Sequence, residues 1–325
     1  MNTLGLLGAL AVGAAFGYGA QRGAFCMNSG FQNATVGDWT KLKALAVAVA
    51  VQLLLLPVVF ETGLARSAPL PLRPTAAVVG GVLFGASMRW AGGCAAGIWY
   101  KLGAGDVGAL LAILGMALGA TASDSGPLLG IRTLLQEAGP SSASSSPSLV
   151  VSVGAGLCLL AASARLTEGR AGAWSWRKTG LWIGIVASLA WPLSELVGRD
   201  FGLAIVPGTT GLLSAVAGHA FPAWDALLLL GILIGGWLAA RQDGPVALSA
   251  PKSTALLKRF AGGLGLGIGA SIATGCTVGQ GLTGLALLAP SSFVVMGAIF
   301  GGSAAATLIG RRLEAASRPM VPSSH

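Results

Sequence analysis

Three cysteines in glycine-rich segments are the residues whose type and spacing suggest chemistry. Cys94 lies in GGCAAG (92–97) and Cys276 in TGCTVG (274–279), so each thiol has a glycine directly before it and another three residues after it. Cys26 lies in a related segment, QRGAFCMNSG. A thiol is a weak hydrogen-bond donor, and its thiolate form is a nucleophile and a metal ligand. The segments are therefore candidates for handling a soft solute, a metal ion or a sulfur atom.

The spacing of the cysteines argues against a metal or cofactor site. With Cys158 there are four cysteines, none in a Cys-x-x-Cys pair, and neither His219 nor His325 is near one in sequence. A structural zinc site needs four nitrogen or sulfur ligands at clustered spacing. We therefore expect no metal and no cofactor. Two alternatives stay open: a disulfide between Cys94 and Cys276, and cysteine as a small apolar filler, the preferred interpretation of Cys158.

The two Gly-Cys loops belong to a longer internal repeat. A constant offset of 182 residues that carries Cys94 onto Cys276 also pairs seven glycines: Gly80 with Gly262, Gly81 with Gly263, Gly85 with Gly267, Gly93 with Gly275, Gly97 with Gly279, Gly115 with Gly297 and Gly119 with Gly301. Such duplication is typical of transporters with paired sites. We predict a first membrane repeat over 1–140 and a second over 141–325, in one structural domain.

The composition indicates a membrane protein. Of 325 residues, 54% are hydrophobic, 10% are charged and 51 are glycine, which a water-soluble domain could hardly present without aggregating. The first apolar run, 4–20, lacks a basic n-region and a cleavage motif, so we expect it to be a retained span. We attribute the net charge of +9 to the membrane surface and topology, because no basic, aromatic nucleic-acid module is present. We expect contact with lipid and no nucleic-acid partner.

Apolar runs predict an all-α integral membrane protein with about nine transmembrane helices. Runs of about 17 to 20 residues suit a helix that crosses a bilayer. A β-barrel would show alternating segments of about ten residues instead. The predicted spans cover 4–20, 43–60, 75–91, 107–122, 149–164, 179–196, 223–240, 259–274 and 291–309.

Four segments between these runs are too polar, glycine-rich or short to cross, yet too apolar for ordinary loops. We interpret them as short re-entrant half-helices, which are tolerated where protein or a water-filled cavity covers the free backbone groups. A faint similarity of 198–201 to the first cysteine segment suggests its inverted partner, with Leu203 near the place of a cysteine. The four segments are 22–36, 94–103, 201–218 and 276–288.

The basic residues predict an orientation. The serine-rich loop 139–148 is uncharged, whereas Lys and Arg cluster in other loops, which the positive-inside rule makes cytoplasmic. The protein is then multi-pass in the inner (plasma) membrane, with the N-terminus outside and the C-terminus cytoplasmic. An odd number of crossings separates the two Gly-Cys copies, so the repeat is inverted and its two loops together form the substrate site. The clusters are Arg22, Lys41 and Lys43; Arg165, Arg170, Arg177 and Lys178; Arg241, Lys252, Lys258 and Arg259; and Arg311, Arg312 and Arg318.

Polar groups beside the loops complete the candidate site. The glycines that flank the cysteines, 93, 97, 275 and 279, let backbone amides turn toward a solute. Gln280 follows the third loop as a candidate donor, and Arg22, Arg89 and Lys101 flank the other two. Ionisable groups inside a membrane are functional candidates. The alternatives are snorkelling at helix ends for Arg89 and Lys101 and a positive-inside anchor for Arg22.

Three segments resemble the YeeE/YedE family of sulfur-compound transporters: YGAQRGAFCMNSGF, GASMRWAGGCAAGIWYKLGAGD and GASIATGCTVGQGLTG. The resemblance covers essentially the whole chain. It implies thiosulfate uptake through a membrane pathway in which three cysteines, matched here by Cys26, Cys94 and Cys276, pass the anion inward. It also implies a possible partner, a small cytosolic sulfur-carrier protein of the TusA type.

We therefore expect a transporter that imports thiosulfate or a related small sulfur anion through a cysteine-lined central pathway. One alternative is a transporter or channel for another small solute, such as sulfite, a selenium compound or another anion. The other is a membrane thiol enzyme that transfers sulfur. The sequence lacks a Cys-x-x-Cys pair, a P-loop and a rhodanese-like loop, which argues against an enzyme and against ATP-driven pumping.

Overall fold

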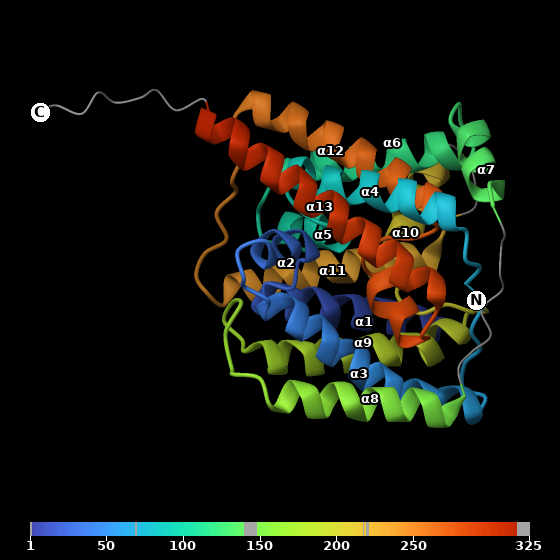
Figure 1. Cartoon of the computed structure of the whole chain (residues 1–325). Coiled ribbons are helices and arrows are strands. Elements are labelled where there is room, and N and C mark those ends of the chain that lie inside the picture. The colour runs from blue at the N-terminus through green and yellow to red at the C-terminus, as the bar shows by residue number, and fades with distance from the viewer. Residues whose placement is uncertain (1, 69, 140–147, 217, 219–220, 317–325) are drawn as a thin grey trace, which may run out of the picture.

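The chain forms a bundle of long helices that lie side by side, with shorter helices packed among them (Figure 1). The structure is a computed structural model that describes residues 2–68, 70–139, 148–216, 218 and 221–316. Over these residues it is all-helical, with two isolated β-bridges and no strand. Residues 140–147 of the serine-rich loop lie outside the described part of the chain, so the external placement of that loop stays a prediction.

A helix of 16 to 27 residues overlaps each of the nine predicted apolar runs over most of its length. Alanine, leucine and glycine dominate these runs, and their small or unbranched side chains suit helices that pack closely. The helices are α1 (Thr3–Arg22), α3 (Thr40–Glu61), α4 (Pro74–Ala91), α6 (Gly108–Asp124), α8 (Leu149–Ala164), α9 (Trp176–Glu195), α11 (Ala223–Arg241), α12 (Ser253–Ile272) and α13 (Pro290–Ala316).

Several of these helices are long and apolar enough to cross a membrane. Four stretches of the described chain qualify by length and composition: 3–34, which joins α1 to the short helix after it, and the helices α3, α11 and α13. A fifth is added if α6 and α7 (Leu129–Glu137), which meet at a bend of 67°, form one span. The chain is thus a multi-pass membrane protein, while the count of nine crossings stays a prediction.

Glycines bring neighbouring long helices into backbone contact. A Cβ added to Gly17 of α1 would lie 2.2 Å from the Ile232 carbonyl oxygen of α11, so only glycine fits there without a shift. Helices α4 and α12 pack antiparallel, because Gly80 near the start of α4 faces Gly269, whereas Gly262 on α12 faces the end of α4. Such contacts replace the hydrophobic driving force that is absent between helices in lipid.

Four shorter helices occupy the four segments that the sequence analysis set apart. They are α2 (Met27–Ala34), α5 (Ala95–Gly103), α10 (Val206–Val216) and the π-helix η1 (Gly279–Gly284). A nine-residue helix is about 14 Å long, whereas the hydrocarbon core is about 30 Å thick. These helices are too short to cross alone, as predicted for half-helices; their re-entrant course stays a prediction.

Candidate functional site

The same kind of turn precedes each of the three predicted cysteines. The residue two positions earlier has a left-handed backbone in every case: Ala24 (φ 45°), Gly92 (φ 77°) and Thr274 (φ 56°). The turn stops the preceding long helix and redirects the chain, and a short helix follows. Cys26 and Cys94 are the extended residues that cap α2 and α5. Each of these two thiols thus lies where a helix leaves its first N–H groups unpaired.

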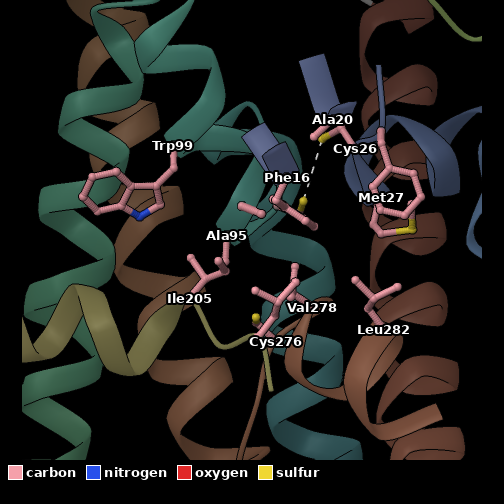
Figure 2. Packing of buried hydrophobic residues seen from close by; sticks show 14 of the residues in the cluster. Phe16, Ala20, Cys26, Met27, Ala95, Trp99, Ile205, Cys276, Val278 and Leu282 are labelled. Carbon is pink, nitrogen blue, oxygen red and sulfur yellow. Dashed lines mark hydrogen bonds between the residues drawn. The ribbon is translucent and has the colours of Figure 1, made fainter. Parts of the chain in front are cut away.

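Cys26 and Cys94 form a buried thiol pair. Each residue is 2% exposed, and the two sulfur atoms are 3.9 Å apart in a thiol–thiol hydrogen bond. Figure 2 draws this contact as the dashed line that begins at Cys26. The amide of Ser29 lies near the Cys26 sulfur, and the amides of Met27 and Gly97 lie near the Cys94 sulfur, although neither thiol forms a capping hydrogen bond. The pair is surrounded by N–H donors, a setting suited to a soft anion.

Two predicted glycines fit tightly around this pair. A Cβ added to Gly97 would lie 2.8 Å from the Cys26 sulfur and 3.3 Å from the Cys94 sulfur. A Cβ added to Gly93 would lie 3.1 Å from the backbone nitrogen of Ile98, in the first turns of α5. Gly97 therefore lets the two thiols meet, and Gly93 lets the chain turn into α5.

Cys276 lies in the same buried core but apart from the thiol pair. It is 2% exposed, and the amides of Ile205, Val278 and Gly279 point to its sulfur. Figure 2 shows it beside Ile205 and Val278, at a different level from Cys26. Ile205 directly precedes α10, just as Cys26 directly precedes α2. The site thus has two thiols on one side and one thiol with an apolar neighbour on the other.

Hydrogen bonds tie the short helices to one another. The Trp99 indole N–H of α5 donates to the Thr209 hydroxyl of α10 at 3.1 Å. The Thr283 hydroxyl of η1 donates to the Leu203 carbonyl oxygen, before α10, at 3.1 Å. With the Cys26–Cys94 contact between α2 and α5, the four short segments form one connected unit at the centre of the site.

The glycines and the glutamine of the third loop have separate roles. The Gln280 side chain is buried, donates to the Thr274 carbonyl oxygen at 3.0 Å and accepts from the Ser292 hydroxyl at 2.7 Å. The Gln280 side chain thus links the loop to α13, and its carbonyl oxygen and one amide hydrogen are both bonded to protein groups. Gly275 has φ 156° and would clash with Gln280 if it carried a Cβ. Gly279 is buried, yet a Cβ there would meet nothing within 4 Å, so empty space borders this loop.

The three predicted cations occupy different surroundings. Arg22 pairs with Asp243 and Arg89 with Glu314, each at 2.6 Å, and both acidic partners are exposed. Lys101 instead donates to the Gly92 carbonyl oxygen at 2.5 Å, within the turn before Cys94. Lys101 is therefore the cation that contacts a cysteine turn, while the two arginines tie helix ends together.

Two residues beside Cys26, Lys41 and Tyr100, were not predicted as part of the site. Lys41, predicted only as a topology charge, donates to the Ser29 hydroxyl at 2.5 Å, and that hydroxyl donates to the Cys26 carbonyl oxygen at 3.1 Å. Tyr100 was not predicted either, yet it is buried and lines the same cavity as Cys26. Tyr100 lies within a cysteine segment and Lys41 lies just before a predicted span, and these positions were the only signal in the sequence. The packing of the helices brings both residues to Cys26, which the sequence does not show.

Cys158 differs from what the sequence suggested. It is exposed on α8, so its interpretation as a buried apolar filler is wrong. All four cysteines are free, which leaves no disulfide between Cys94 and Cys276 in this structure. Among the described residues no group of three or more histidines, cysteines and acidic residues is placed to hold a metal ion.

An all-helical, multi-pass membrane protein with thiols and unpaired helix N-termini buried at its centre has the design of a solute transporter. The chain matches the sulphur transport family over residues 22–305 and belongs to that family. It is 33% identical over 306 residues to the thiosulfate transporter TsuA of Spirochaeta thermophila, covering 88% of this chain and 93% of the relative. It is 31% identical over 310 residues to the thiosulfate transporter TsuA of Escherichia coli K12, covering 87% and 88%. Family membership assigns the chain to transport and not to catalysis.

Proposed function

We propose that this protein imports thiosulfate, or a closely related small sulfur anion, through a central pathway lined by Cys26, Cys94 and Cys276. The observation that carries the proposal is the placement of each thiol in a turn that leads into a short buried helix, with backbone amides near the sulfur atoms. The names of the two TsuA relatives support the choice of anion.

The chemistry of such a site matches a dianion with one soft end. Moving a divalent oxyanion out of water is costly unless other donors replace the water. The N–H groups and dipoles of α2 and α5 supply these donors, and neutral thiols supply weaker ones to the terminal sulfur. In this proposal the thiols hold the anion without a covalent bond, so passage needs neither a reductant nor an oxidant.

The same proposal includes an inverted repeat, with one unit in 1–140 and the other in 141–325. The antiparallel contact of α4 with α12 supports it, because these helices lead into Cys94 and Cys276. A second pair of contacts also supports the inverted repeat. Helix α6 packs on α12 at Gly115, and α13, which corresponds to α6 in the repeat, packs on α4 at Gly85. In this arrangement the two cysteine loops enter the bilayer from opposite faces.

We also propose that the nine long helices all cross an inner (plasma) membrane, with the N-terminus outside and the C-terminus cytoplasmic. Support comes from the ends of the bundle: the start of α1 and the end of α13 lie at opposite ends (Figure 1). The clusters that contain Lys41, Lys178 and Arg312 are then on the cytoplasmic side. A small cytosolic sulfur carrier of the TusA type remains a proposed partner at that face.

Growth of a bacterial host that lacks its own sulfate and thiosulfate uptake tests the function. The host should grow on thiosulfate as sole sulfur source when it expresses this chain, and not with an empty vector. Membrane expression is checked by immunoblot. If growth occurs on sulfite or a selenium-containing analogue but not on thiosulfate, the second candidate, another small anion, replaces the first.

A further inference from the structure

A cavity of about 320 Å³ adjoins the thiol pair at the end of the bundle that carries Lys41. It extends from the exposed Ser249 to the buried Cys26, and Ser29, Tyr100 and Lys101 also line it. The volume is sufficient for a small oxyanion with some of its water. A solute in this cavity would therefore reach the Cys26 thiol from one side and the protein surface from the other.

The cavity has an excess of positive charge. Lys41 and Lys101 bind neutral acceptors, the Ser29 hydroxyl and the Gly92 carbonyl oxygen. Asp106 is the acidic residue among the residues that line the cavity, and it is paired with Arg259 at 2.6 Å. Among the described residues no carboxylate forms an ion pair with either lysine, although Asp38 lies near enough to attract Lys41, and the two ammonium charges repel each other. An anion between them would relieve this repulsion.

We propose that this cavity is a second binding subsite for the transported anion, with its oxygen atoms on Lys41 and Lys101 and its sulfur end toward Cys26. The proposal rests on the proposed function for the identity of the anion. Under the proposed orientation the subsite faces the cytoplasm, so it receives the anion after the thiol pair. Charge-assisted hydrogen bonds to two ammonium groups favour a divalent oxyanion over a neutral sulfur compound.

In this proposal the thiols and the lysines recognise different parts of the anion. The thiols of Cys26 and Cys94 contact the soft sulfur atom, and the lysines contact the hard oxygen atoms. A protein with thiols alone would bind any soft solute, and one with lysines alone would bind any oxyanion. The combination selects an ion that has both, which is a specificity that neither group provides separately.

Equilibrium dialysis of ³⁵S-thiosulfate against the purified full-length protein tests the subsite. Lys41→Gln and Lys101→Gln combined should weaken binding about tenfold or more, the usual effect of losing charge-assisted hydrogen bonds. Lys43→Gln is the matched control, because Lys43 is in the same first turn of α3 but lies over the Trp176 ring. It should leave binding within about twofold of wild type. Lys41→Arg with Lys101→Arg keeps the charge and should retain most of the affinity, which separates charge from folding.

Uptake by the same variants separates this inference from the proposed function. Wild-type binding and uptake in the double glutamine variant would overturn the subsite and leave the function standing. If wild-type protein takes up no thiosulfate but binds it in a lysine-dependent way, the function falls and the subsite stands. Absence of thiosulfate binding by a folded wild-type protein would remove both.

Discussion

Gly97 is the residue on which the geometry of the thiol pair depends most directly. Its hydrogen atom occupies the place where a Cβ would press on both sulfur atoms, at 2.8 and 3.3 Å. We predict that Gly97→Ala separates Cys26 from Cys94 and lowers ³⁵S-thiosulfate uptake per molecule more than about tenfold, as expected for an overpacked core site. Gly154→Ala on α8 is the control, because a Cβ there meets nothing within 4 Å. Equal uptake by both variants would show that the contact between the thiols is not needed.

Gly279 and Gly297 provide a second comparison of single residues. A Cβ at either position would meet nothing within 4 Å, but Gly279 is buried beside Cys276 and Gly297 is exposed on α13. Gly279→Val should therefore fill space next to the third thiol and lower uptake at least about tenfold, while membrane yield stays within about twofold. Gly297→Val should affect neither quantity. If Gly279→Val transports as wild type, the empty space beside the third loop is not part of the pathway.

At the scale of elements, a left-handed turn precedes each of the three cysteines, and a residue other than glycine in such a turn has a strained backbone. Thr274 is a β-branched residue with φ 56°, and its side chain is exposed, so little packing offsets the strain. We predict that Thr274→Gly stabilises the protein by about 0.5–1 kcal/mol, the strain relieved less the entropy cost of glycine. Thermal melting in detergent measures this shift. A lower melting temperature would mean that the threonine side chain contributes contacts worth more than the strain.

The elements themselves could largely be predicted from the sequence. Apolar runs located the nine long helices, and glycine-rich, half-polar segments located α2, α5, α10 and η1, because the membrane imposes strict limits on length and polarity. The roles of Gln280 and Lys41 could not be predicted, since their partners Ser292 and Ser29 are set by helix packing. The matched glycines Gly115 and Gly297 show the same limit: Gly115 packs on Phe260, whereas Gly297 is open.

At the scale of the whole molecule, the inverted repeat depends on topology. Reporters fused after Arg312 or placed in 165–178 should read cytoplasmic, and a reporter in the serine-rich loop 139–148 should read external, because basic loops stay on the cytoplasmic side. Fusions with alkaline phosphatase, which is active outside, and a fluorescent protein that folds inside measure both signals. A cytoplasmic signal from 139–148 would remove the argument that the two cysteine loops enter from opposite faces.

The central claim is that the buried thiols line the path of the anion. The direct measurement is ³⁵S-thiosulfate uptake into proteoliposomes, normalised to reconstituted protein, for Cys26→Ala, Cys94→Ala, Cys276→Ala and Cys158→Ala. Each of the first three should lower uptake about tenfold or more with normal yield, because a donor to the anion is lost. Cys158→Ala should transport as wild type, since that thiol is exposed on α8. Wild-type uptake by a variant that lacks both Cys94 and Cys276 would contradict the account.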